Sequence, residues 1–187
     1  NSHFKITKYF LENNINVFCE KPLCLNYKDA KKLITLSKKN KIRLYISDIE
    51  NYKNKKIKIF NDNKIIRQKL DKSKKNILFR LFYHDLYLLF DKASFNKITN
   101  IKIINNKNGE FIFSFRANNK KFNFYYNLNK KEKIHVINKT NYLNHSNNPL
   151  KTMIKSVLLE KVDFFKNNKT AMKILKVIEK IKKKAKN

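Results

Sequence analysis

The chain has 187 residues and a formal net charge of +30, with 44 lysines and arginines against 14 aspartates and glutamates. Only four of the basic residues are arginine, although bidentate recognition of phosphates and bases favours arginine over lysine. The lysines are spread over the whole chain, so we interpret them as solvated surface residues. The charge by itself therefore does not favour a nucleic-acid-binding protein.

The sequence also lacks the patterns of membrane and metal-binding proteins. No apolar run has the length needed to cross a membrane. Cys19 and Cys24 are separated by four residues, which is not the spacing of a zinc-binding pair. His3, His135 and His145 show no spacing with carboxylates that would form a metal site. We therefore expect a cytoplasmic protein with buried or half-buried free thiols and no metal.

The first 50 residues alternate between helix and strand patterns. A helix pattern precedes a short apolar strand at residues 15–19. Asn26 is an expected N-cap with Asp29 three residues later, as in an imperfect capping box, and apolar residues then repeat at helical spacing until Asn40. A second strand at residues 42–46 completes a βαβ unit, whose two strands should run parallel.

The middle of the chain contains a lysine-rich amphipathic segment at residues 52–72 and a strongly apolar helix pattern at residues 77–90. Arg80, His84 and Asp85 interrupt the apolar helix. The hydrophobic period then changes from helical spacing to alternation, which predicts an antiparallel meander. Its four candidate strands are residues 98–104, 110–116, 122–128 and 133–138.

Aromatic residues occupy one face of two of these strands, and the pattern supports two interpretations. Phe111, Phe113 and Phe115 share a face of one strand, and Phe122, Phe124 and Tyr126 share a face of the next. Such rings stack bases in some RNA-binding sheets. More often they form the face that packs against helices, and we prefer this packing interpretation. After the sheet, Asn148 and Pro149 begin a helix in the usual order, and residues 171–181 form a final amphipathic helix.

The order of short motifs gives the chain a family resemblance. Glu20-Lys21-Pro22 follows the first strand directly, at the carboxyl end where open α/β sheets bind their ligands. Together with Asn1-Ser2-His3, His84-Asp85 and Asn148-Pro149-Leu150, this tripeptide closely resembles the signature of the Gfo/Idh/MocA family. Its members, such as glucose-fructose oxidoreductase and inositol dehydrogenase, use NAD or NADP to oxidise or reduce a sugar carbon.

The resemblance implies an α/β plus α+β fold. Residues 1–50 would be the C-terminal part of a Rossmann-like dinucleotide-binding domain. Residues 51–187 would be an α+β domain for substrate binding and oligomerisation, with a mostly antiparallel sheet and a C-terminal helix that packs back. A homo-oligomer formed through this sheet is an expectation of the same kind.

The resemblance also implies an upstream half with a Gly-x-Gly-x-x-Gly turn, whereas Gly109 is the only glycine here. We therefore expect an N-terminally truncated chain that lacks on the order of 60 to 80 residues, about two βαβ units, and whose carboxyl end is complete. The alternative is a short protein that has lost its cofactor half. We rank it lower, because it would expose an edge of a parallel sheet.

Lys21 and His84 are the catalytic residues that the resemblance implies. Lys21 would anchor the reacting oxygen beside the nicotinamide, and His84 would accept the proton of the sugar hydroxyl. The NAD or NADP site would include Glu20, Lys21, Pro22 and His3. We also expect that the Lys21–Pro22 peptide bond can be cis. Without the resemblance, Lys21 would be one solvated lysine among many, and His84 a buried helix residue.

The chain departs from the family pattern near His84. Family enzymes usually carry an aspartate four residues before this histidine, and here the position holds Arg80. An arginine cannot act as a base, but it can bind a carboxylate or phosphate of the substrate, so we assign Arg80 and Asp85 to substrate binding. Residues 51–54 also differ from the family pattern, and no substrate contact is transferred to them.

The sequence thus predicts an NAD(P)-dependent oxidoreductase that acts on a sugar, a sugar nucleotide or a related polyol. Two alternatives stay open. The first is a non-catalytic sugar-binding or assembly member of the family, which Arg80 would favour. The second is a lysine-rich nucleic-acid-binding protein that stacks bases on exposed phenylalanine rings, and it ranks below the first.

Overall fold

The computed structural model describes residues 2–53, 55–93, 95, 97–143 and 146–186. The chain divides into two compact units. Unit 1 holds Asn1–Tyr52 and Pro149–Glu179, and unit 2 holds Lys53–Asn148 and Lys180–Asn187. The sequence placed a division after residue 50 and assigned everything beyond it to one domain, whereas residues 149–179 group with the first 52 residues.

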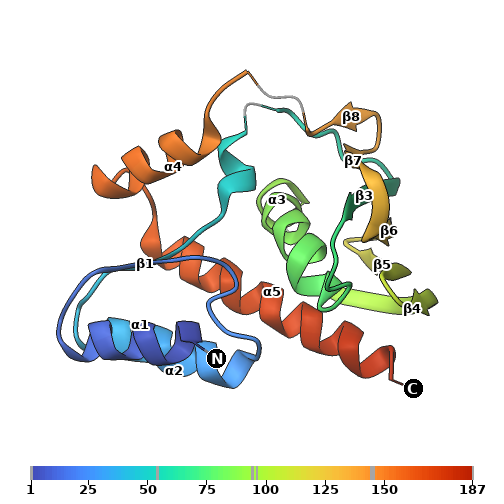
Figure 1. Ribbon diagram of the computed structural model, residues 1–187. Helices are drawn as coiled ribbons and strands as arrows, with labels where there is room; N and C mark the ends of the chain where they lie inside the picture. Colours follow the sequence, from blue (N-terminus) through green and yellow to red (C-terminus); the bar gives the residue numbers. More distant parts are fainter. Residues whose placement is uncertain (1, 54, 94, 96, 144–145, 187) are drawn as a thin grey trace. The chain divides into compact units, whose positions relative to one another are not determined.

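Unit 1 is built around a pair of parallel strands. Helix α1 (Ser2–Glu12) leads to β1 (Val17–Cys19), and α2 (Tyr27–Lys39) connects β1 to β2 (Leu44–Ile46) (Figure 1). Val17, Phe18 and Cys19 pair in parallel with Leu44, Tyr45 and Ile46. This pairing confirms the predicted βαβ order. The short 3-10 helix η1 (Ile49–Tyr52) follows β2.

Helix α2 shows how the local sequence determines its ends. Asn26 Oδ1 accepts a hydrogen bond of 2.8 Å from the backbone N–H of Asp29, and Asn26 Nδ2 donates one of 2.8 Å to the Asp29 carboxylate. Asn40 is the C-cap, and lysines occupy the last turn, where they favour the negative end of the helix dipole. Both predicted ends are confirmed.

Residues 149–179 pack on this α/β part of unit 1. Helix α4 (Pro149–Leu158) begins at the predicted proline, and α5 (Phe164–Lys184) follows it. The Asn167 side chain accepts from Ile46 N and donates to Ile46 O, both at 2.9 Å. The Glu179 carboxylate accepts from Tyr27 N at 2.7 Å. These bonds join α5 to β2 and to the first turn of α2.

Unit 2 contains a six-stranded mixed sheet with the strand order β4-β5-β6-β3-β7-β8. All neighbouring strands are antiparallel except β3 and β6, which are parallel. The strands are β3 (Asp62–Leu70), β4 (Ile98–Lys107), β5 (Glu110–Ala117), β6 (Lys120–Asn127), β7 (Asn129–Ile137) and β8 (Thr140–Asn141).

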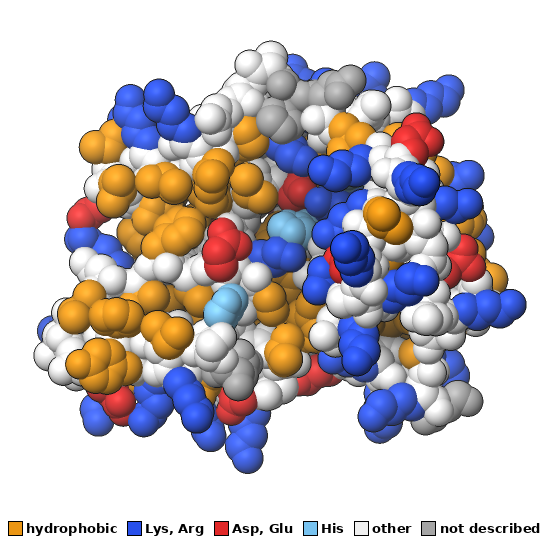
Figure 2. All heavy atoms as spheres, in the orientation of Figure 1, with side chains coloured by type: hydrophobic (Ala, Val, Ile, Leu, Met, Phe, Trp, Pro, Cys, Tyr) orange, Lys and Arg blue, Asp and Glu red, His pale blue; other side chains and the backbone are white. Residues whose placement is uncertain are grey.

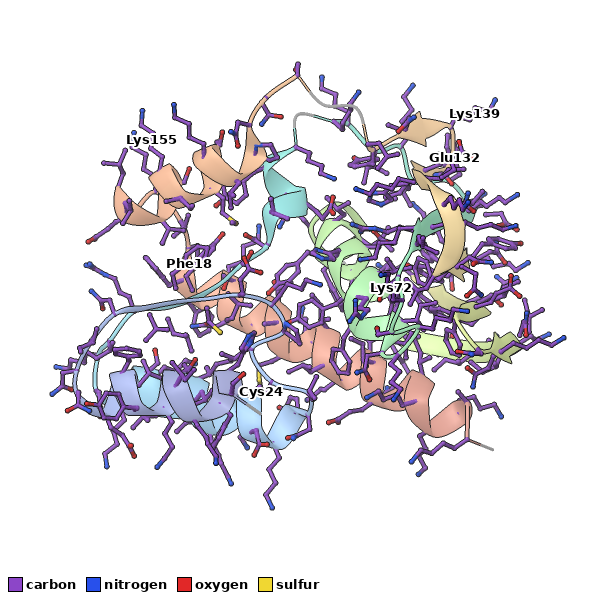
Figure 3. All side chains as sticks on the ribbon, in the orientation of Figure 1. Phe18, Cys24, Lys72, Glu132, Lys139 and Lys155 are labelled. Carbon is purple, nitrogen blue, oxygen red and sulfur yellow. The ribbon has the colours of Figure 1, made fainter. Side chains whose placement is uncertain are left out.

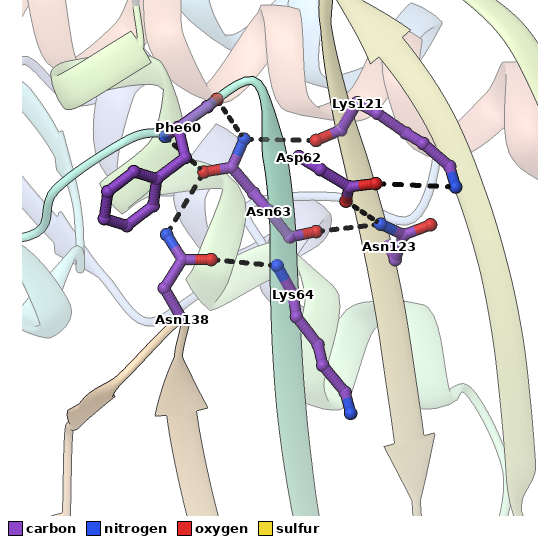
Figure 4. Close-up of polar contacts among 7 residues, drawn as sticks. All are labelled: Phe60, Asp62, Asn63, Lys64, Lys121, Asn123 and Asn138. Carbon is purple, nitrogen blue, oxygen red and sulfur yellow. Dashed lines mark hydrogen bonds and ion pairs between the residues drawn. The ribbon is translucent and has the colours of Figure 1, made fainter.

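The sequence predicted four of these strands in the right places, but the predicted simple meander was wrong. In the sheet, strand β3 lies between β6 and β7. In the sequence, it belongs to residues 52–72, which were described only as a lysine-rich amphipathic segment. Asn63 fixes the entry of β3 into the sheet (Figure 4). Its Nδ2 donates to the carbonyls of Phe60 and Lys121, and its Oδ1 accepts from Phe60 N and from Asn138 Nδ2. This fully buried amide thus uses all of its hydrogen-bonding capacity.

One face of the sheet is an aromatic core that the π-helical turn η2 (Leu78–Phe82) and helix α3 (Tyr83–Ala93) cover (Figure 1). The Phe82 ring lies edge-on to Phe113 and Phe124, with ring centroids 5.0 Å apart in each case. All six aromatic residues of the predicted ladders are buried. The packing interpretation is therefore confirmed, and the base-stacking alternative, which needs exposed rings, is wrong.

Candidate functional site

The first group of predicted site residues lies where β1 ends. Glu20 is exposed, Lys21 is half-buried, and the Lys21–Pro22 peptide bond is cis, as expected from the sequence. His3 Nδ1 lies 2.8 Å from the Pro22 carbonyl oxygen. Because a carbonyl oxygen can only accept, this bond requires the proton on Nδ1. The bond joins the start of α1 to the Glu20-Lys21-Pro22 turn, so the structure brings His3, Glu20, Lys21 and Pro22 together.

The carboxyl end of β2 lies beside this turn. Parallel pairing continues past the strands, because Ser47 N donates to Cys19 O at 2.9 Å. The next residue, Asp48, is 8% exposed and accepts from the Tyr45 hydroxyl and from Asn51 Nδ2. Burial raises the pKa of Asp48, although hydrogen bonds from Tyr45, Asn51 and Asn167 act in the opposite direction. The sequence analysis missed this buried acid, which its place directly after a strand could have indicated.

The second group of predicted site residues lies on one helical segment of unit 2. Arg80 is in the π-helical turn η2, and His84 and Asp85 are in the first turn of α3. Arg80 donates to the carboxylate of Asp71, which lies just after β3. Burial raises the pKa of Asp71, but hydrogen bonds from Ser73 and the charges of Arg80 and Lys69 lower it overall. The Asp71 partner was not predicted, and it balances the charge of Arg80 within unit 2.

Asp85 has no exposed surface and makes three polar contacts. Its Oδ1 accepts from Arg67 Nη1 at 2.8 Å and lies 2.8 Å from His135 Nε2, and its Oδ2 accepts from the Tyr126 hydroxyl at 2.7 Å. Burial alone would raise the pKa of Asp85, but the charges of His135 and Arg67 and the bonds from His135 and Tyr126 lower it to about 2. Asp85 was predicted to bind substrate. With both oxygens bonded inside unit 2, it is instead suited to position its neighbours.

His84, next to Asp85, is half-buried. His84 belongs to unit 2 and Lys21 to unit 1. Their meeting at one substrate therefore stays a prediction.

The glycine and cysteine positions limit the chemistry that the chain can supply. Gly109 lies in the β4–β5 hairpin with φ of +77°, so it does not form a phosphate-binding turn before a helix. Cys19 and Cys24 are free and buried, as predicted (Figure 3 labels Cys24). Burial raises the pKa of the Cys24 thiol to about 12, which disfavours the reactive thiolate.

The described residues hold neither a metal-binding cluster nor a membrane-spanning helix. Residues 2–53, 55–93, 95, 97–143 and 146–186 contain no group of three or more histidines, cysteines or acids that could hold a metal ion. Over the same ranges, no helix is long and apolar enough to cross a membrane. His145, which the sequence analysis considered for a metal site, and Asn1 of the first motif lie outside these residues.

The sequence of unit 1 and the fold of the chain are similar to those of known proteins. Residues 1–47 match the GFO_IDH_MocA profile, described as an oxidoreductase family with an NAD-binding Rossmann fold. No curated protein matches the sequence. Among solved structures, UDP-N-acetylglucosamine 3-dehydrogenase GnnA from Acidithiobacillus ferrooxidans is similar with a TM-score of 0.83 at 13% identity. The alignment covers 97% of this chain and 74% of that chain.

Two further structures share the fold. The WlbA (WbpB) dehydrogenase from Thermus thermophilus, in complex with NAD and UDP-GlcNAcA, is 12% identical with a TM-score of 0.71, over 94% of this chain and 68% of that chain. A dehydrogenase (MviM) from Clostridium difficile is 16% identical with a TM-score of 0.75, over 98% of this chain and 76% of that chain. Residues 1–47 thus match the Gfo/Idh/MocA oxidoreductase family with its NAD-binding Rossmann fold, and the chain shares the fold of these dehydrogenases.

Proposed function

We propose that this chain forms the substrate-handling part of an NAD(P)-dependent oxidoreductase that acts on a sugar, a sugar nucleotide or a related polyol. The main observation is the Glu20-Lys21-Pro22 turn at the carboxyl end of a parallel strand pair, held to α1 by His3. The relatives described as a UDP-N-acetylglucosamine 3-dehydrogenase and as a complex with NAD and UDP-GlcNAcA support this substrate class.

The residues present fit one end of a dinucleotide site. Glu20, Lys21, Pro22 and His3 lie at the strand edge where a nicotinamide would bind. When bound, the nicotinamide supplies a carbon that accepts or gives a hydride. The pyrophosphate needs a glycine-rich turn, and the only glycine of this chain is in the β4–β5 hairpin. We therefore propose catalytic activity for a protein that combines a glycine-rich pyrophosphate-binding turn with the residues of this chain.

The two proposed catalytic residues divide the acid–base work. Lys21 holds the oxygen of the reacting carbon with its ammonium group. His84 takes the proton from that oxygen as the hydride leaves the carbon, so that a hydroxyl becomes a carbonyl. In the reverse direction the same groups return the proton.

Turnover of Lys21→Met and His84→Ala variants tests these roles, in protein produced from the natural gene with any sequence that precedes Asn1. Each change should lower kcat by about 10²-fold or more, the usual contribution of a positioned acid–base group. Lys31→Met is the matched control, because Lys31 is an exposed lysine of α2. Turnover that is unchanged in both variants would overturn the assignment.

A second candidate function is a family member that binds a sugar without catalysis. The observation that favours it is Arg80 in place of the usual aspartate. The contacts of Arg80 determine which variant can test this function. Because Arg80 is paired with Asp71, Arg80→Asp alone would bring two carboxylates together, so the change is combined with Asp71→Asn. Turnover gained by the double variant would show that the arginine had disabled the site. Turnover lost would show that the arginine binds the substrate.

A further inference from the structure

Three residues of the sheet form a polar row beneath the start of α3. Arg67 of β3 pairs with Tyr126 of parallel β6 and with His135 of antiparallel β7. Side chains of residues paired across neighbouring strands point to the same face of a sheet. The three polar groups therefore reach the aromatic face together, and all three meet the carboxylate of Asp85.

This contact fixes the orientation of the helix. The Asp85 carboxylate has no exposed surface, and a buried charge persists only where partners replace the water that it has lost. Its partners lie on three adjacent strands, so any rotation of the first turn of α3 about its axis would break at least one bond.

His84 is the residue directly before Asp85 and projects about 100° away from it around the helix. Four residues before His84 in the sequence, Arg80 forms an ion pair with Asp71. Among the residues that the structure describes, the charged partners of Asp85 are Arg67 and His135. In the sequence, the half-buried His84 thus stands between Arg80 and Asp85, whose side chains are both anchored.

We propose that Asp85, held by Arg67, Tyr126 and His135, is a positioning residue that sets the direction of the His84 imidazole. The proposal rests on the function proposed for His84. Asp85 does not touch the substrate, and it acts by fixing the helical turn that carries the base. The positioning set therefore includes three residues, Arg67, Tyr126 and His135, that the motif around His84 does not contain.

The test compares Tyr126→Phe with Tyr142→Phe. Both tyrosines are fully buried, and each variant loses one hydroxyl at nearly constant volume. The Tyr126 hydroxyl donates to Asp85, whereas the Tyr142 hydroxyl donates to Lys55 O at 3.2 Å. The measurements are the His84 ring signal in a ¹H–¹³C NMR spectrum, kcat, and the KM for the dinucleotide, with thermal melting to verify folding.

Tyr126→Phe should shift the His84 signal and lower kcat roughly tenfold, because small misplacement of a catalytic group is costly, while the KM for the dinucleotide stays unchanged. Tyr142→Phe should do neither. A His84 signal that is the same in both variants would overturn the proposal, even if kcat falls. If Tyr126→Phe does not fold, His135→Gln replaces it in the same measurements, with the same expected shift of the His84 signal and fall in kcat. If the wild type shows no turnover, the proposed function fails, and the NMR comparison still decides the positioning role.

Discussion

The Asp85 cluster makes the stability of unit 2 depend on pH. The pKa of Asp85 is about 2 in the folded chain, against an ordinary value of 3.8. A carboxyl whose pKa is depressed by folding stabilises the fold above its unfolded pKa, and that contribution is lost as pH falls through the folded pKa. For a shift of this size the contribution is about 2 kcal/mol.

We expect the free energy of unfolding to fall between about pH 4 and pH 2 as this contribution is lost. Urea unfolding of the wild type and of Asp85→Asn over this range measures the effect. The variant should be less stable near neutral pH, because its buried partners lose a charge, and its stability should depend less on acid. An identical pH dependence in both proteins would contradict the assignment of the low pKa to Asp85.

Sequence reasoning reached some site residues and not others for a physical reason. Glu20, Lys21 and Pro22 are adjacent in the chain, so a local motif could identify them. The partners of Asp85 lie on three strands far apart in sequence. Their convergence depends on β3 entering between β6 and β7, which no local pattern encodes. Asp71, the partner of Arg80, was missed for the same reason.

At the scale of elements, the β4–β5 hairpin depends on the single glycine. Gly109 has φ of +77°, a conformation that costs a residue with a Cβ roughly 1–2 kcal/mol. A Cβ here would also lie 2.7 Å from Asn129 Oδ1. The Asn129 side chain would have to move, although its Nδ2 now donates to Asn108 O at 3.1 Å.

Gly109→Ala should therefore lower the free energy of unfolding by about 1–2 kcal/mol, measured by the urea midpoint. Asn119→Gly is the matched control, because Asn119 also has a positive φ, of 62°, in the β5–β6 hairpin. Glycine relieves the strain there, so the control should be neutral or slightly stabilising. If Gly109→Ala is as stable as the wild type, the hairpin can adopt a turn conformation that does not need glycine at this position.

The elements that the sequence predicted correctly have strong local signals. The capped helix α2 has Asn26 and Asn40 at its ends, and the aromatic strands β5 and β6 alternate regularly. Strand β3 lacked such a signal, because its exposed positions hold an aspartate, a lysine and a leucine and only two of its nine residues are buried. The π-helical turn η2 was read as ordinary helix, since both have nearly the same apolar spacing.

At the scale of the whole molecule, exposed apolar surface and positive charge have opposite effects on self-association. Unit 1 exposes large apolar side chains on α1, β1 and α4 (Figure 2). They are Ile6, Tyr9, Phe10, Phe18, Leu150, Ile154 and Leu158. Patches of this kind promote association, whereas the net charge of +30 keeps copies of the chain apart.

Salt should therefore promote self-association, because it screens the repulsion between chains and leaves apolar contacts in place. Sedimentation of the 187-residue chain at about 50 mM and about 500 mM salt measures the change. Ile154→Lys should reduce association at high salt, while Thr152→Lys on the same helix, whose residue is exposed and polar, serves as the charge control. Equal association in both variants would place the contact elsewhere, such as on the sheet through which the family resemblance predicts oligomers.

We predict that Lys21 and His84 act on one substrate. A crystal structure of the protein produced from its natural gene, with NAD(P)⁺ and a nucleotide sugar bound, tests it most directly. We predict that Lys21 Nζ and an imidazole nitrogen of His84 both lie about 2.6–3.2 Å from the oxygen on the carbon that faces the nicotinamide. A complex with both ligands in place and either side chain too far from that oxygen for one bridging water would contradict the account.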